Sequence, residues 1–258
     1  MRVERFELDC RPDKAYVRFP FVFKGEPVKG VSCALSLRSA GDMGFAADAE
    51  RGYSNRRAFF ADLGIPFDRV FSRSQVHSLD VAIVEGRGGS LPPGDGIALS
   101  DPASFACVTA ADCLPIFLLD RDTLAFAVVH SGWKGTGIVL AALRAMERRW
   151  GTRPSSVAAV FGPCIRGCCY AVDEERAAAF ESAFGPAVHR DGAGVRIDLQ
   201  AANARLLETA GAADLAICGN CTFTDERLGS FRREGPDRFT RMAAVVGWLP
   251  EEQETCRK

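Results

Sequence analysis

The chain has 258 residues, of which 47% are hydrophobic and 25% charged, and its formal net charge is −1. This length suits a single large α/β unit, and the balanced charge does not favour nucleic acid or an anionic membrane surface as a partner. The charged N-terminal residues 1–19 contain no signal-peptide apolar run, and no stretch is long enough to span a bilayer. We therefore expect a cytoplasmic protein, and we predict one domain over residues 1–258 because no repeat or linker divides the chain.

Strand-like and helix-like stretches alternate along the sequence, which predicts an α/β fold of mixed sheets packed between helices. Ser54 and Asp173 are candidate N-caps of two of the helices. The predicted elements are, in chain order, strands at 14–24 and 31–37, a helix at 54–63, strands at 81–84, 105–109, 114–119 and 124–129, a helix at 138–150, a strand at 157–161, a helix at 174–184, a strand at 195–199, a helix at 200–210, and strands at 215–217 and 241–248.

One strand–loop–helix unit is the clearest in the chain. The apolar run 124–129 predicts a strand buried on both faces and is followed by His130, the glycine-rich loop 131–137 and an amphipathic helix. Lys134 and the N–H groups that begin the helix are candidates for holding a phosphate. The loop lacks the Walker spacing, however, and a tight strand-to-helix connection is the alternative interpretation.

Only three histidines occur in the sequence, and two of them lie at predicted strand ends. His77 precedes a strand and His130 follows one, whereas His189 lies in a polar stretch and receives no role. A histidine at a strand end is more often a hydrogen-bonded structural residue than a metal ligand. Position alone therefore does not assign a metal to either of them.

Cys113 lies between two apolar runs, next to Asp112, and adds a third candidate ligand. Three ligands with an open fourth position are typical of catalytic zinc, and a His/His/Cys set suits Zn²⁺ while leaving copper or iron possible by ligand type. A buried, inert Cys113 is the alternative. Asp112 is a candidate hydrogen-bond partner of the site or general base, or else an ordinary turn residue.

The remaining cysteines and arginines offer weaker patterns. Cys218 and Cys221 form a CxxC pair, and a second group contains Cys164, Cys168 and Cys169, so a structural four-cysteine site or a redox pair is conceivable. Arg38 and Arg233 have the forked guanidinium that suits phosphate or carboxylate, although exposed arginines are usually just solvated.

Taken together, the motifs resemble the YfiH-like or laccase-domain family, also called multicopper polyphenol oxidoreductases. The resemblance covers about residues 20–248, and its most specific segments are Ala-Asp-Cys-Leu-Pro at 111–115 and His-Ser-Gly-Trp-Lys-Gly at 130–135. The other matching segments are Gln75-Val76-His77, Gly162-Pro163-Cys164-Ile165, Cys169-Tyr170, Cys221-Thr222-Phe223, Ser230-Phe231-Arg232-Arg233 and Arg241-Met242.

The resemblance implies a zinc site formed by His77, Cys113 and His130 in a single α/β domain of sheets packed between helices. It also implies a purine nucleoside enzyme that carries out phosphorolysis of adenosine, inosine and methylthioadenosine and deaminates adenosine. Purine nucleoside and phosphate would then be the partners, with the chain a monomer or weak homodimer. Asp112 would move protons, and Arg38, Arg233 and Lys134 would bind phosphate. Cys169 and Cys221 fall inside family motifs, which disfavours a separate four-cysteine site.

Two departures and two alternative functions accompany this hypothesis. The segment after Arg38 lacks the family's glycine pair, its loop is shortened, and Thr240 replaces a glycine before Arg241-Met242. A copper polyphenol oxidase is one alternative, but three histidines are few for a multicopper array. A hydrolase that edits peptidoglycan precursors is the other, with a non-catalytic zinc protein as its simpler form.

Overall fold

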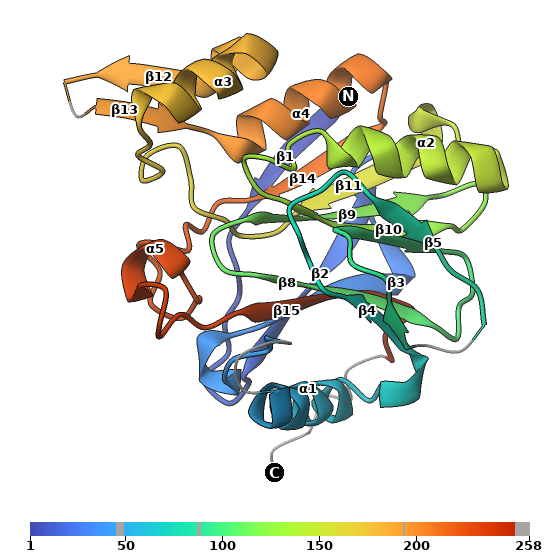
Figure 1. The fold of residues 1–258 in the computed structure, drawn as a ribbon. Helices are drawn as coiled ribbons and strands as arrows, with labels where there is room; N and C mark the ends of the chain where they lie inside the picture. The colour runs from blue at the N-terminus through green and yellow to red at the C-terminus, as the bar shows by residue number, and fades with distance from the viewer. Residues whose placement is uncertain (45–48, 87–88, 193, 251–258) are drawn as a thin grey trace.

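The computed structural model describes residues 1–44, 49–86, 89–192 and 194–250. Two β-sheets lie face to face, and helices cover their outer faces (Figure 1). Parallel and antiparallel pairs occur in both sheets, so the predicted mixed α/β architecture is confirmed. Within the described residues, no helix combines the length and the apolar character needed to cross a membrane.

The larger sheet has seven strands and the smaller one six, and a separate two-stranded ribbon stands apart from both. In sheet order, the larger sheet contains β1 (Arg2–Phe6), β14 (Asp214–Cys218), β11 (Val157–Phe161), β9 (Leu114–Asp120), β10 (Phe126–Ser131), β7 (Gly96–Leu99) and β5 (Val81–Ile83). The smaller sheet contains β2 (Tyr16–Phe23), β3 (Glu26–Ser36), β15 (Met242–Gly247), β8 (Phe105–Ala110), β4 (Val70–Arg73) and β6 (Ser90–Leu91), and the ribbon contains β12 (Val188–Asp191) and β13 (Gly194–Ile197).

The helices divide between the two outer faces. Helices α2 and α4 bury apolar residues against the larger sheet, and α1 covers the smaller sheet with Phe59 and Phe60 (Figure 1). The helices are α1 (Ala49–Asp62), α2 (Ile138–Trp150), α3 (Glu174–Phe184), α4 (Leu199–Ala210) and the short α5 (Phe231–Glu234), with 3-10 turns at Arg38–Ala40, Phe67–Arg69, Pro154–Ser156 and Gly185–Ala187.

The main core lies between the two sheets, where the facing strands are apolar along their length. Phe19 of β2 meets Phe117 of β9 edge to face, with ring centroids 5.6 Å apart. Phe117 is fully buried, and burial of a phenylalanine side chain contributes about 1.5–3 kcal/mol. This contact is one of those that pack the two sheets against each other.

Several predicted elements differ from those observed. Helix α1 begins at Ala49, so Ser54 lies inside it and is not its N-cap. Strand β10 begins at Phe126 because Leu124 has a positive φ of 60° in the preceding turn, and the strand extends through His130. The cap at Asp173 is confirmed, since its side chain accepts a hydrogen bond from the N–H of Arg176. Strands β1, β4, β6, β7 and β12 and helix α5 were not predicted.

Candidate functional site

A cleft of about 560 Å³ lies where the chain passes from β8 of the smaller sheet to β9 of the larger one. Sheet register brings distant residues to this end: His130 of β10 is paired with Pro115 of β9, two residues beyond Cys113. Met242 of β15 is paired with Ala110 at the end of β8, which places Arg241 beside the same turn. The cleft is therefore formed at the junction of the two sheets.

His77, Cys113 and His130 converge on the wall of this cleft. One ligand atom from each lies within 4.8 Å of the other two, and the Cys113 Sγ and His77 Nε2 atoms are 3.8 Å apart. The imidazole rings meet edge to face with centroids 5.0 Å apart. His130 is buried, Cys113 is half-buried and His77 is exposed, so the group is open on one side.

A carboxylate that the sequence analysis missed organises this group. Asp95 is fully buried, and its oxygens accept hydrogen bonds from the backbone N–H groups of Val76, His77 and Ser78 at 2.7–3.2 Å. Asp95 Oδ1 also lies 2.9 Å from His130 Nδ1. That contact leaves Nε2 of His130 for a ligand, as in the carboxylate–histidine–metal arrangements common in zinc proteins.

Local backbone geometry also makes room for the group. A Cβ atom on Gly132 would lie 2.9 Å from Cys113 Sγ and 2.9 Å from His77 Cδ2, so only glycine fits there. His77 and Asp112 both have positive φ, 59° and 83°, although neither is glycine. Such conformations are costly unless the surroundings fix them, and they concentrate at functional sites.

The electrostatics of the group favour a thiolate. Burial raises the pKa of Cys113, but the charges and hydrogen bonds of His130 and His77 outweigh it and lower the pKa to about 6. Burial lowers the pKa of His130, but Cys113 and Asp95 outweigh it and raise the pKa to about 9. For Asp95, burial raises the pKa, and the hydrogen bonds from His130 and Ser78 lower it well below its usual range. A thiolate near neutral pH is the form of cysteine that binds metal.

Another part of the cleft lining carries three arginines, each above an aromatic ring that also lines the cleft. The guanidinium carbon lies 4.8 Å from the ring centroid for Arg176 over Trp133, 5.5 Å for Arg232 over Tyr170, and 4.1 Å for Arg241 over Phe239. Stacking of this kind holds a guanidinium in place. Two of the three already use an N–H group, because Arg232 Nη1 donates to the carbonyl oxygen of Ala171 at 2.8 Å and Arg241 Nη1 donates to Asp42 Oδ2 at 3.1 Å.

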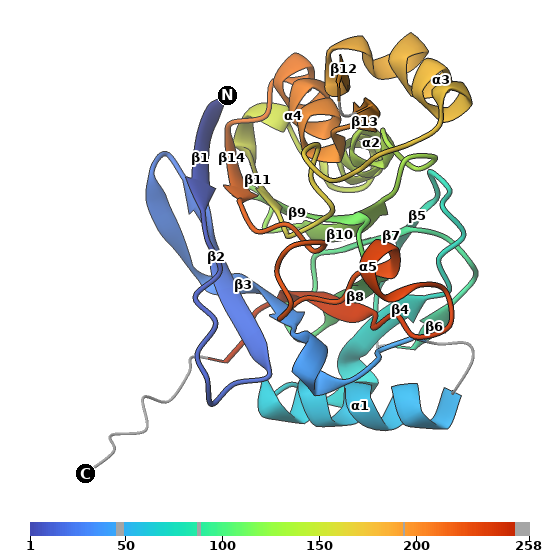
Figure 2. The ribbon, with the colours of Figure 1, turned by 90° about the vertical axis from the view of Figure 1, so that its left-hand side faces the viewer.

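Asp112 lines the cleft, but both of its carboxylate oxygens already have partners. Oδ1 accepts from the Thr222 hydroxyl at 2.6 Å, and Oδ2 accepts from the N–H of Arg232 at 2.6 Å. Asp112 therefore anchors the start of α5, which lies at the open end between the sheets (Figure 2). This geometry fits a positioning role.

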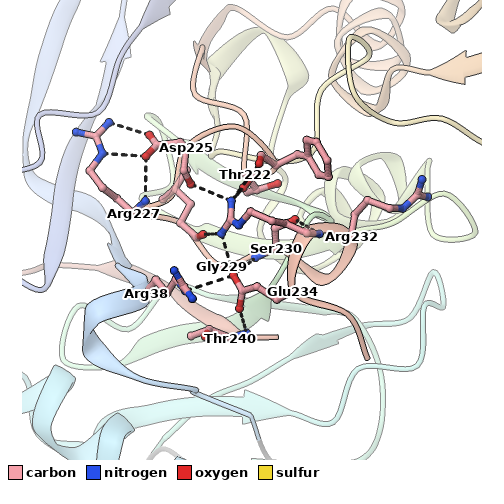
Figure 3. Close-up of polar contacts among 12 residues, drawn as sticks. Arg38, Thr222, Asp225, Arg227, Gly229, Ser230, Arg232, Glu234 and Thr240 are labelled. Carbon is pink, nitrogen blue, oxygen red and sulfur yellow. Dashed lines mark hydrogen bonds and ion pairs between the residues drawn. The ribbon is translucent and has the colours of Figure 1, made fainter. Parts of the chain in front are cut away.

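Arg38, Arg233 and Lys134, the residues predicted to bind phosphate, are not among the residues that line the cleft. Arg233 donates to the carbonyl oxygens of 222, 223, 225 and 228 and to Glu234. Arg38 lies beside Glu234 of α5, with 3.5 Å between Nε and Oε1 (Figure 3). Lys134 is exposed and lies over the ring of Trp133.

The arginines that do line the cleft carried little signal in the sequence. Arg232 was noted only as an arginine beside Arg233, and Arg241 only as part of a motif, so neither was predicted as a site residue. Arg176 lies in the first turn of α3, among other charged residues. Asp95 lies between two glycines after a proline pair, a pattern typical of an exposed turn. Its burial depends on pairing between β7 and β10, which are distant in sequence.

The fold and the site together define an α/β protein of two stacked sheets with a candidate three-residue metal site at their junction. Residues 30–249 match the family model described as multi-copper polyphenol oxidoreductase laccase, and the chain belongs to this family. The resemblance stated from the motifs is thereby confirmed.

Two curated relatives are named purine nucleoside phosphorylase. One, from Deinococcus radiodurans, is 34% identical over 204 residues, which cover 78% of this chain and 79% of the relative. Another, from Corynebacterium glutamicum, is 31% identical over 211 residues, or 80% of this chain and 84% of the relative.

Two solved structures share the fold. YlmD from Geobacillus stearothermophilus has a TM-score of 0.83 at 24% identity, covering 95% of this chain and 100% of that one. The Bacillus licheniformis protein YfiH has a TM-score of 0.81 at 23% identity, covering 92% and 98%. At 23% and 24% sequence identity, these two comparisons show a shared fold and no more.

Proposed function

We propose that the chain is a zinc-dependent purine nucleoside enzyme, which cleaves nucleosides such as adenosine, inosine and methylthioadenosine with phosphate and also deaminates adenosine. The convergence of His77, Cys113 and His130 within 4.8 Å on the wall of a cleft that also carries three arginines is the observation that carries the proposal. The names of the curated relatives support the nucleoside substrate.

The residues present fit a zinc ion. Two imidazole nitrogens and one thiolate are typical zinc donors, and three protein ligands leave a position open for catalysis. Asp95 fixes the tautomer of His130, and Gly132 leaves the space that an ion beside Cys113 requires. Zinc held there would supply Lewis acidity to the reaction.

Arg176, Arg232 and Arg241 are our candidates for the phosphate site. Their guanidinium groups reach the cleft from three different segments and would neutralise and orient a phosphate for attack on C1′ of the ribose. The roles given to Arg38, Arg233 and Lys134 from the sequence stay predictions, and their positions outside the cleft favour the other three arginines.

The aromatic residues of the cleft are our candidates for holding the purine. Tyr170, Trp133 and Phe231 line it, and Phe231 leaves 45% of its surface exposed. A volume of about 560 Å³ lies within the 300–1,000 Å³ usual for small-molecule sites. A flat base stacked on these rings would be shielded from water beside the metal-binding wall.

The full chain, purified and analysed for metal, tests the proposal with adenosine in the presence and absence of phosphate. We expect adenine to form only with phosphate, inosine to form without it, and zinc to be bound in a 1:1 ratio. Absence of turnover of adenosine, inosine and methylthioadenosine by zinc-loaded protein would contradict the proposal. Oxidation of a phenol by copper-loaded protein, or hydrolysis of a UDP-muropeptide, would favour the alternative functions instead.

A further inference from the structure

A second group of cysteines lies outside the cleft described above. Cys168 and Cys169, in the loop that follows β11, meet Cys221, which follows β14, and the three sulfur atoms lie within 4.8 Å of one another. The two neighbouring sulfurs, Cys168 Sγ and Cys169 Sγ, are 3.4 Å apart. Cys218, the other half of the CxxC pair, is not in the group: it is buried in β14, and its Sγ faces Asn220.

The group is accessible from solvent. Cys168 is exposed, Cys169 is half-buried, and Cys168 and Cys221 both line a surface depression of about 530 Å³. One loop separates this depression from the cleft, since Ile165 and Tyr170 line the cleft and Cys168 lines the depression. The three sulfurs therefore form a distinct site on the other side of that loop.

The surroundings favour negative charge on Cys221 rather than on Cys169. Burial raises the pKa of Cys221, but hydrogen bonds from backbone N–H groups outweigh it and lower the pKa. Burial and the neighbouring Cys168 raise the pKa of Cys169 to about 12. The N–H of Arg166 donates to Cys221 Sγ at 3.5 Å. The guanidinium groups of Arg166 and Arg227 line the depression, where they stand beside the carboxylates of Glu7, Asp225 and Glu226. Asp225 is paired with Arg227 at 2.7 Å, so this acid is already neutralised.

We propose that Cys168, Cys169 and Cys221 bind one Cu(I) ion through their three sulfur atoms. Thiolates are soft ligands that select monovalent copper and zinc, but structural zinc takes four ligands in a tetrahedron. In the part of the chain that the structure describes, no histidine nitrogen or carboxylate oxygen lies close enough to all three sulfurs to serve as a fourth ligand. A three-sulfur set suits Cu(I) better than a closed zinc site. On binding, the ion replaces the thiol protons, which pass to water, and copper remains monovalent without electron transfer.

The test is an anaerobic titration of the reduced, metal-free full chain with Cu(I) buffered by bicinchoninate. The Cys113→Ser variant is the background, because it removes one ligand from the His77, Cys113 and His130 group. We expect this variant to bind one equivalent of Cu(I), with three sulfur neighbours in X-ray absorption. Adding Cys168→Ser should lower Cu(I) affinity by about tenfold or more, since loss of even an outer partner of a metal site costs 10–100-fold.

Cys10→Ser in the same background is the matched control, because Cys10 is a half-buried cysteine outside the three-sulfur group, and copper binding should stay unchanged. If Cys221→Ser fails to fold, the exposed Cys168 and the half-buried Cys169 still allow the test. The proposal is overturned if Cys168→Ser binds copper as tightly as its background does, or if absorption shows fewer than three sulfurs. It is also overturned if the sulfurs retain Zn²⁺ but not Cu(I), or only oxidise to a disulfide.

Discussion

The two walls of the cleft are built in different ways. The histidine and cysteine wall is positioned by strand pairing and by Asp95, which gathers the backbone N–H groups of three successive residues. The arginine wall comes from α3, α5 and the segment before β15, and side chains hold it in place. We call the first the rigid wall, because backbone pairing positions it, and the second the adjustable wall, because side-chain contacts position it. We propose that the rigid wall binds the metal and the adjustable wall binds the anion.

Removal of a proposed ligand from the rigid wall should have the largest effect. For Cys113→Ala we expect loss of bound metal and a fall in both activities of more than about a hundredfold, the upper end of the cost of losing an outer partner. Elemental analysis and product chromatography measure it. Cys10→Ala is the control and should keep metal and turnover, and full activity in metal-free Cys113→Ala would refute the proposed mechanism.

Asp95→Asn tests whether the rigid wall depends on its buried carboxylate. The variant loses the charge that orients His130 and presents an amide to N–H donors, so zinc affinity should fall by about 10–100-fold. Competition with a chromophoric chelator measures the affinity. An unchanged affinity would show that the strands position His130 without the carboxylate.

Arg232→Lys probes the adjustable wall, since it keeps the charge and removes the fork. A charge-assisted hydrogen bond contributes about 1.5–3 kcal/mol, so the KM for phosphate should rise by about 10- to 100-fold while zinc content stays constant. Steady-state kinetics over a range of phosphate concentrations measures it. Arg38→Ala is the comparison: a larger rise in that variant would restore the role predicted for Arg38 from the sequence.

Glu234→Gln should have the smallest effect, one on stability. Glu234 accepts from the N–H groups of Ser230 and Thr240 at 3.1 and 2.8 Å and from Arg233 at 2.8 Å (Figure 3). Burial raises its pKa, but these hydrogen bonds outweigh it and lower the pKa. We expect a loss of about 1–3 kcal/mol at neutral pH.

The pH dependence of that loss follows from the lowered pKa of Glu234. The stabilisation is complete above the unfolded-state pKa of about 4.3 and disappears as pH falls through the lower folded-state pKa. Urea unfolding of both proteins at several pH values measures the difference. A difference that did not shrink in acid would mean that shape rather than charge matters at this position.

Sequence patterns predicted the elements whose signals are local. Strand β11 and helix α2 have the predicted bounds, because apolar spacing defines them and Gly151 ends the helix. The grouping of His77, Cys113 and His130 was predicted from ligand chemistry together with the family resemblance. Asp95 and Arg176 could not be found this way, since their roles depend on contacts with residues far along the chain.

Because the proposed zinc site lies at the junction of the two sheets, a bound ion would also connect them. His77 follows β4 of the smaller sheet, His130 belongs to β10 of the larger one, and Cys113 lies on the crossing between them. An ion bound by all three would cross-link the two halves of the sandwich. Because such an ion binds the folded chain and not the unfolded one, occupancy of the site and cohesion of the whole molecule are linked quantities.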